Sequence, residues 1–180
     1  MIYMFLADGF EEIEALCPLD LLRRVGAPIK TVAVGGSLLV TGSHGITVKA
    51  DMMEDELTDE APQMIILPGG MPGTKNLDNS AIVIRAIENS ISVGAYIAAI
   101  CAAPSVLGKR GVLRGKEAIC FPGFEEYLVG AKISDKRVVR DDKIITAAGM
   151  GVALDFGLEL VSALCGKEKA EELRKAVLAD

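Results

Sequence analysis

The sequence has no tryptophan, a single histidine and few aromatic residues, which make up 4% of its 180 residues. Proteins that stack nucleobases do so on aromatic side chains, and nucleic-acid binding also needs a basic surface. This chain instead has 25 acidic and 19 basic residues, and hence a formal net charge of −6. The composition therefore argues against nucleic-acid partners and against binding to anionic membranes.

Long apolar runs and an export signal are also missing. No apolar run approaches the roughly 20 residues that a membrane-spanning helix needs. The apolar start of the chain has no basic region and reaches an acidic residue at Asp8. We expect a first strand there rather than a signal peptide. The sequence thus predicts a cytoplasmic protein with no membrane partner.

The motifs of metal and nucleotide sites are absent too. The four cysteines form no CxxC pair, and His44 is far in sequence from all of them. This spacing disfavours a zinc site. Neither GxGxxG nor GxxxxGK[ST] occurs, so we predict no metal and no nucleotide or other cofactor. The chain is 51% apolar and can fill a core without disulfides, so we expect reduced thiols.

Strand-like and helix-like patterns alternate along the chain, which is typical of one α/β domain with a largely parallel sheet. We assign residues 1–180 to this single domain. Pro18 lies inside the first helical pattern and predicts a kink or a late start there. The expected strands are 2–7, 29–34, 64–67, 94–100 and 117–121, with hairpins at 38–49 and 137–147; the expected helices are 11–25, 81–92, 102–109, 151–165 and 167–179.

Cys101 is the most informative residue, because it follows an apolar strand pattern and precedes a helix of small residues. Hydrolases expose their nucleophile at such a strand–turn–helix junction. Backbone N–H groups that are free at a helix start favour negative charge nearby. Free cysteines are also among the most buried residues. This segment alone leaves a reactive and a structural cysteine equally open.

Two other strand ends carry residues that could serve Cys101, since ligands of open parallel sheets bind beyond the carboxyl ends of the strands. After the 64–67 strand, Gly70 could present an N–H group that forms an oxyanion hole together with that of Ala102. A plain turn is the alternative interpretation. After the first strand, an inward glutamate with a raised pKa could hydrogen-bond the sulfur. Periodicity favours Glu14, although stabilisation by the helix dipole is sufficient to explain an acidic first turn.

Several segments together resemble the Parkinson-disease protein deglycase branch of the ThiJ/PfpI superfamily, in order and over nearly the whole chain. These segments are 8–14, 18–20, 23–24, 67–70, 99–104 and 149–151. The resemblance implies a flavodoxin-like three-layer α/β sandwich with a mostly parallel central sheet, like that of class I glutamine amidotransferases. It also implies a homodimer, for which the first helix, with Cys17, Pro18 and Leu21, offers a face.

The resemblance further implies the roles of individual residues. Cys101 is expected to be a low-pKa nucleophile that oxidises readily, and a protonated Glu14 is expected to hydrogen-bond to it. Arg24 and His44 are candidate anion-binding residues; a solvated helix end and a hairpin turn are their alternative interpretations. Ala102 and Phe121 occupy positions where protease-like and deglycase-like relatives carry histidine. Protease chemistry therefore lacks its base and is disfavoured.

The function expected from these residues is cysteine-dependent defence against oxidative and carbonyl stress. A weak glutathione-independent glyoxalase or protein deglycase activity would be its enzymatic form, with a small 2-oxoaldehyde or a glycated compound as substrate. Cys101 would add to the aldehyde and Glu14 would move the proton. The alternative is a non-catalytic holdase or binding module on the same scaffold.

Overall fold

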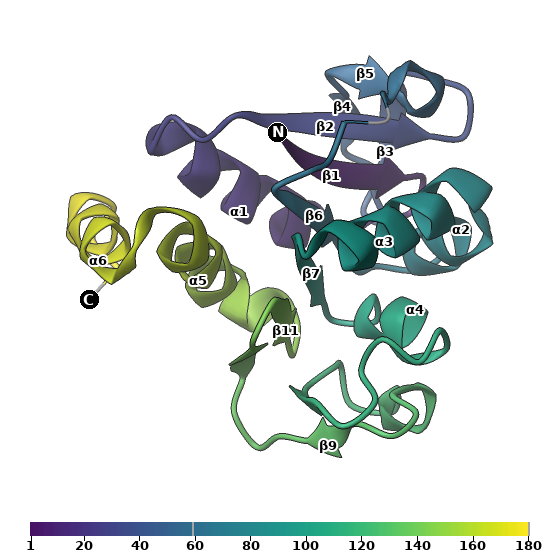
Figure 1. The fold of residues 1–180 in the computed structure, drawn as a ribbon. Coiled ribbons are helices and arrows are strands. Elements are labelled where there is room, and N and C mark those ends of the chain that lie inside the picture. Colours follow the sequence, from purple (N-terminus) through teal and green to yellow (C-terminus); the bar gives the residue numbers. More distant parts are fainter. Residues whose placement is uncertain (59, 180) are drawn as a thin grey trace.

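A computed structural model describes residues 1–58 and 60–179. Seven of the strands in this part of the chain form one sheet in the order β10-β11-β7-β6-β1-β2-β5 (Figure 1). Only β10 runs antiparallel, against β11. The strands span Ile2–Ala7 (β1), Ile29–Val34 (β2), Met52–Met53 (β5), Met64–Leu67 (β6), Tyr96–Ile100 (β7), Val138–Asp141 (β10) and Ile144–Ala147 (β11).

Helices cover both faces of this sheet and make it the middle of three layers. One face is covered by α1 (Glu12–Arg24), α5 (Ala153–Cys165) and α6 (Lys167–Ala176), and the other by α2 (Gly73–Asn79), α3 (Ala81–Val93) and α4 (Pro104–Gly108) (Figure 1). This confirms the expected flavodoxin-like sandwich with a mostly parallel sheet. Short 3₁₀ helices lie at Glu54–Glu56 (η1), Glu125–Tyr127 (η2) and Met150–Val152 (η3).

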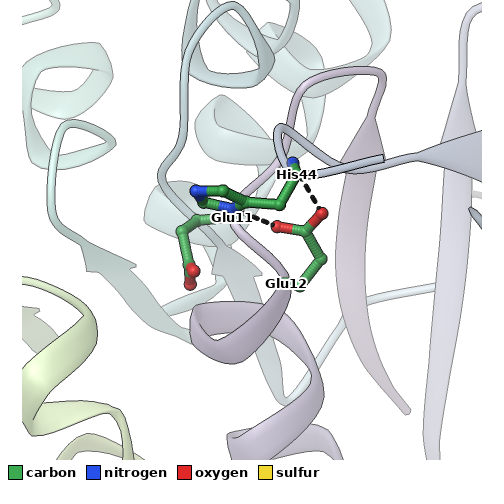
Figure 2. A group of neighbouring side chains, drawn as sticks. All are labelled: Glu11, Glu12 and His44. Carbon is green, nitrogen blue, oxygen red and sulfur yellow. Dashed lines mark hydrogen bonds and ion pairs between the residues drawn. The ribbon is translucent and has the colours of Figure 1, made fainter. Parts of the chain in front are cut away.

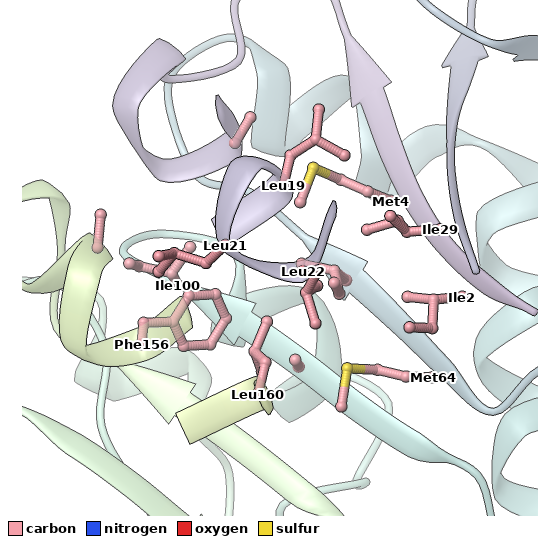
Figure 3. Packing of buried hydrophobic residues seen from close by; sticks show 14 of the residues in the cluster. Ile2, Met4, Leu19, Leu21, Leu22, Ile29, Met64, Ile100, Phe156 and Leu160 are labelled. Carbon is pink, nitrogen blue, oxygen red and sulfur yellow. The ribbon is translucent and has the colours of Figure 1, made fainter. Parts of the chain in front are cut away.

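Strand β1 shows why its segment is continuously apolar. Successive side chains of a strand point to opposite faces. Ile2 and Met4 accordingly pack with the α1 and α5 residues Leu22 and Phe156 (Figure 3), whereas Phe5 packs in the second core on the α2–α4 face. A strand buried on both faces carries no polar alternation, as expected for the middle of a parallel sheet.

Several element boundaries differ from those expected. The helix after Cys101 begins at Pro104 rather than residue 102, and the strand expected at 117–121 is limited to Glu117–Ala118 (β8). β8 pairs with Lys132–Ile133 (β9) in a separate small sheet. The chain turns after β8 to bring Phe121 against Cys101. The two hairpins are confirmed, the first as Leu39–Thr41 (β3) with Thr47–Lys49 (β4).

The first helix runs through Pro18 and begins at Glu12, so the late start that Pro18 suggested does not occur. Pro18 and Leu21 are buried inside the chain, against Gly157 of α5. A Cβ on Gly157 would lie 2.6 Å from Leu21 Cδ1, which shows how closely the two helices approach. Pro18 and Leu21 are therefore part of the core and are not free to form a dimer face.

Candidate functional site

Cys101 sits at a strained turn at the carboxyl end of β7. Its φ of 64° lies in the left-handed region, which non-glycine residues rarely adopt. The surrounding main chain holds this conformation: the Cys101 N–H donates to the Ala147 carbonyl at 2.9 Å, and the Cys101 carbonyl accepts from the Phe121 N–H at 2.7 Å. The Cys101 residue is partly exposed. Strain of this kind is maintained only where the surroundings fix it, and it gathers at functional sites.

Glu14 reaches this thiol from the first turn of α1. Its own N–H is capped by the Glu11 carboxylate at 2.7 Å, and its side chain is buried, with 1% of the residue exposed. The carboxyl group accepts the Gly69 N–H at 3.0 Å, lies next to Cys101 across Gly69, and is influenced by the Cys101 thiol and the Met150 N–H. Burial, reinforced by the charge of Glu11, raises the pKa of Glu14 to about 7. The structure thus brings Glu14 to Cys101, as expected.

Two glycines at the end of β6 complete the surroundings of the sulfur. The N–H groups of Gly70 and Ala102 both face the Cys101 thiol, which is the arrangement expected of an oxyanion hole. Gly70 has a φ of 90°, a conformation that favours glycine. Gly69 belongs to the same Gly-Gly turn, and its N–H serves Glu14. A Cβ there would lie 2.6 Å from Cys101 Cβ and would also collide with the Glu14 carboxylate.

The protonation of Cys101 differs from the expectation. Burial, together with the negative charge of Glu14, raises the pKa of the thiol to about 12, although the N–H groups of Ala102 and Gly70 act in the opposite direction. The low pKa implied by the resemblance is therefore not found while Glu14 is ionised. The two groups titrate as a pair, and a thiolate forms at neutral pH only where Glu14 keeps the proton. Helix α4 begins three residues after Cys101 and has only five residues, so the helix itself has little influence on the thiol. The protonation of the sulfur is governed by the neighbouring N–H groups and by Glu14.

His44 does not reach Cys101 but bonds to Glu12 (Figure 2). Its Nδ1 lies 2.8 Å from Glu12 Oε2, and its backbone N–H donates to Glu12 Oε1 at 2.8 Å. Burial opposes ionisation of Glu12, but these bonds and the Ile46 N–H lower its pKa to about 2. The hydrogen bond and the charge of Glu12 raise the pKa of His44. Two carboxylates beside one imidazole do not suit an anion, so His44 is a hairpin anchor here.

The same three residues bring potential metal ligands together. One ligand atom each from Glu11, Glu12 and His44 lie within 4.8 Å of one another. Both Glu12 oxygens, however, already accept N–H groups from the β3–β4 hairpin, and Glu11 caps α1. The clustering of these three residues is therefore explained by the attachment of the β3–β4 hairpin to α1.

Arg24 lies at the opposite end of α1 from Glu14, about 15 Å along the helix axis at 1.5 Å per residue. Its guanidinium forms an exposed ion pair with Asp20 at 2.6 Å. Within one chain the structure therefore does not bring Arg24 to the Cys101 site. Among the other free cysteines, Cys17 and Cys120 have pKa values raised chiefly by burial, and Cys165 is exposed.

Within residues 1–58 and 60–179, every helix is too short or too polar to cross a membrane. This agrees with the absence of long apolar runs in the sequence.

Comparison with known proteins assigns the chain to a family. The model of the DJ-1/PfpI family matches residues 1–163. Protein dj-1beta of Drosophila melanogaster is 35% identical over 97% of this chain and 95% of its own length. Glutathione-independent glyoxalase DJR-1.2 of Caenorhabditis elegans is 31% identical over 93% and 90%. A solved structure of oxidized Toxoplasma gondii DJ-1 superposes with a TM-score of 0.90 at 35% identity, covering 98% of this chain and 97% of that one. The chain belongs to the DJ-1/PfpI family.

Proposed function

We propose that this protein uses Cys101 to convert 2-oxoaldehydes into 2-hydroxy acids, and that the same thiol is oxidised under peroxide stress. The observation that carries the proposal is the pairing of the Cys101 thiol with the buried Glu14 carboxyl, opposite the N–H groups of Gly70 and Ala102. A relative that covers most of this chain is named a glutathione-independent glyoxalase.

The chemistry needs no external oxidant. The Cys101 sulfur adds to the aldehyde carbon C1, and the carbonyl oxygen takes up a proton to give a hemithioacetal. Glu14, with a pKa of about 7, suits the transfer of the C1 proton to C2. C1 then becomes a thioester carbonyl while the C2 ketone becomes a hydroxyl. Water hydrolyses the thioester, releasing the 2-hydroxy acid and the thiol. The N–H groups of Gly70 and Ala102 would stabilise the oxyanions.

Peroxide oxidation would use the same groups. The thiolate attacks the peroxide O–O bond and an S–O bond forms as hydroxide leaves; a second peroxide then carries the sulfenic acid to a sulfinate. A protonated Glu14 and the N–H group of Ala102 could both donate hydrogen bonds to the new oxygens. Unlike Cys17 and Cys120, Cys101 lies at the strained turn beside Glu14 and the N–H groups of Gly70 and Ala102, so we expect it to oxidise first.

The decisive experiment measures lactate formed from methylglyoxal by the wild type and by C101A, E14Q and C165A. We expect C101A to lose turnover and E14Q to lose about 10²–10⁴-fold, the usual value of a general acid–base. C165A removes an exposed thiol elsewhere and should match the wild type. Equal lactate production by C101A and the wild type would reject the proposal. After treatment with mild peroxide, mass analysis should show a gain of two oxygen atoms at Cys101.

A holdase or binding module is the second candidate. It is favoured by the raised pKa of Cys101 and by the pairing of His44 with Glu12 instead of with the thiol. In that case C101A would suppress the aggregation of an unfolding client protein as well as the wild type does, and neither protein would form lactate.

We further propose that the chain works in the cytoplasm as a homodimer. Ile13 of α1 and Ile46 of the first hairpin are 49% and 54% exposed, and the Ile46 N–H is 3.4 Å from Oε1 of Glu12, the neighbour of Ile13. This end of α1 thus offers an apolar surface, unlike Pro18 and Leu21. Analytical ultracentrifugation should show that I13D dissociates the dimer. The equally exposed Val129 supplies the control variant V129D.

A further inference from the structure

We propose that the mouth of the Cys101 site selects aldehydes whose C2 carries an apolar group of aromatic size, and that Phe121 determines this selection. The inference rests on the proposed function and adds to it the class of substrate. The Phe121 N–H donates to the backbone carbonyl of Cys101, but the Phe121 side chain has no part in the chemistry described above.

The position of Phe121 is fixed by Cys101 itself. Its N–H donates to the Cys101 carbonyl at 2.7 Å, so its Cα cannot move away from the strained turn without breaking that bond. The residue nevertheless remains 48% exposed. A large aromatic side chain whose backbone is bonded to the nucleophile's turn, and which is itself open to solvent, is an apolar surface available to a ligand.

Gly149 connects this ring to Glu14. A Cβ built on Gly149 would lie 3.2 Å from Phe121 Cδ2 and 3.9 Å from Glu14 Oε1. The ring and the carboxyl therefore lie on the same side of the Gly149 backbone, close to one point. An aldehyde carbon bonded to Cys101 and within reach of Glu14 would bring its C2 substituent near Phe121.

Met150 extends the apolar surface. Its N–H faces the Glu14 carboxyl, and the residue is 53% exposed. Methionine adapts its shape and makes favourable sulfur–aromatic contacts. Phe121 and Met150 thus offer apolar side chains at the two points where the main chain contacts Cys101 and Glu14.

The polar groups at this site are directed at the reacting atoms. The N–H groups of Gly70 and Ala102 face the sulfur, and the Glu14 carboxyl lies next to Cys101 across Gly69. The Arg137 guanidinium, near the turn after Met150, donates to the Gly151 carbonyl at 3.3 Å. The C2 substituent is therefore expected to meet apolar side chains, and an anionic substituent would gain little.

The first test compares kcat/KM for phenylglyoxal and methylglyoxal, with mandelate and lactate quantified by chromatography. Burying a ring in place of a methyl group is expected to favour phenylglyoxal about tenfold in the wild type, within the range for added apolar groups in a pocket. F121S should lose most of that preference, because its kcat/KM for phenylglyoxal should fall by a larger factor than its kcat/KM for methylglyoxal. V129S removes a similarly exposed apolar side chain and should keep the wild-type ratio.

A second measurement does not depend on turnover. Iodoacetamide, N-benzyliodoacetamide and iodoacetate all alkylate a thiolate by forming an S–C bond as iodide leaves, so their rates at Cys101 compare only their substituents. We expect the benzyl reagent to react fastest relative to its rate with free cysteine, and F121S or M150S to reduce this advantage.

The outcomes separate this inference from the proposed function. Selective benzyl alkylation that F121S abolishes, without any Cys101-dependent lactate, supports the apolar mouth and rejects the glyoxalase proposal. Lactate formation with no preference for phenylglyoxal, or with a preference unchanged in F121S, overturns the inference. Faster reaction with iodoacetate than with the benzyl reagent also overturns it.

Discussion

The Gly69 N–H donates to Oε2 of Glu14 at 3.0 Å and so links the end of β6 to the first turn of α1. These residues are 55 positions apart in the chain. The bond satisfies one oxygen of a buried carboxyl group, and the same glycine lies against Cys101 Cβ. Gly69 thus fixes the distance between the acid and the sulfur.

Gly69→Ala should therefore damage the site and the fold together. The added Cβ would meet the Glu14 carboxylate and Cys101 Cβ, and we expect a loss of about 2 kcal/mol in the free energy of unfolding. Urea denaturation and the rate of Cys101 alkylation measure the two effects. Gly26→Ala is the matched control, because Gly26 has a φ of 72° but open space around it. That change should cost about 1 kcal/mol and leave alkylation unchanged. Similar alkylation rates in both variants would contradict the role of Gly69.

Most of the fold could be predicted from the sequence because its strands are buried on both faces and read as short apolar runs. β1, β2 and β6 lie within one residue of their expected bounds. The misjudged elements have local patterns that tertiary contacts override. Pro18 does not delay α1, since packing on α5 outweighs the lost hydrogen bond, and the residues after Ala118 turn to meet Cys101 instead of continuing a strand.

The candidate site was predictable only where a residue type carries its own chemistry or lies at the expected nucleophile turn. Cys101, Glu14, Gly70 and Ala102 do converge. Gly70 and Ala102 were predictable because they flank the expected nucleophile turn, whereas the N–H groups of Gly69 and Met150 serve Glu14, and no local pattern links them to it. The partner of His44 depends on where a hairpin folds back on α1. The raised pKa of Cys101 depends on burial beside a second acid. Neither the partner of His44 nor this pKa could therefore be predicted from the sequence.

Glu14→Gln should stabilise the protein more at alkaline than at acidic pH. The folded-state pKa of Glu14 is about 7, against an ordinary 4.5, so the native state holds this proton more tightly than the unfolded state does. Unfolding free energy thus falls as pH rises from 4.5 to 7 and is constant above that. The full cost is about 3 kcal/mol. Melting temperatures at pH 5 and 8.5 measure it, with the exposed Glu88→Gln as control. A pH-independent difference would contradict the raised pKa.

The alkylation of Cys101 should depend on pH in two steps in the wild type and in one step in Glu14→Gln. The pair loses its first proton near pH 7 and its second toward pH 12, and each loss increases the thiolate population. Glutamine has no proton to share, so a single transition remains. Rates of iodoacetamide addition from pH 5 to 11 measure the first step in full and the beginning of the second. A wild-type rate that stays flat through pH 7 would mean that Glu14 takes all the charge, and thiol chemistry at neutral pH would then be excluded.

Glu12→Ala should release the first hairpin from α1, whereas His44→Gln should weaken it only in a defined pH range. The buried Glu12 carboxylate accepts N–H groups from His44 and Ile46, and removing it breaks these part-buried hydrogen bonds at a cost of about 1–2 kcal/mol. Hydrogen exchange at those two amides should accelerate in Glu12→Ala and stay slow in His44→Gln. The hydrogen bond and charge of Glu12 raise the pKa of His44 above 6.5, and Glu11 acts in the same direction. The stabilisation that His44 contributes is therefore complete below pH 6.5. It is lost as pH rises through the raised value. Melting temperatures of the wild type and His44→Gln should therefore differ at pH 6 and converge at pH 9; a difference that grows with pH would contradict the ion pair.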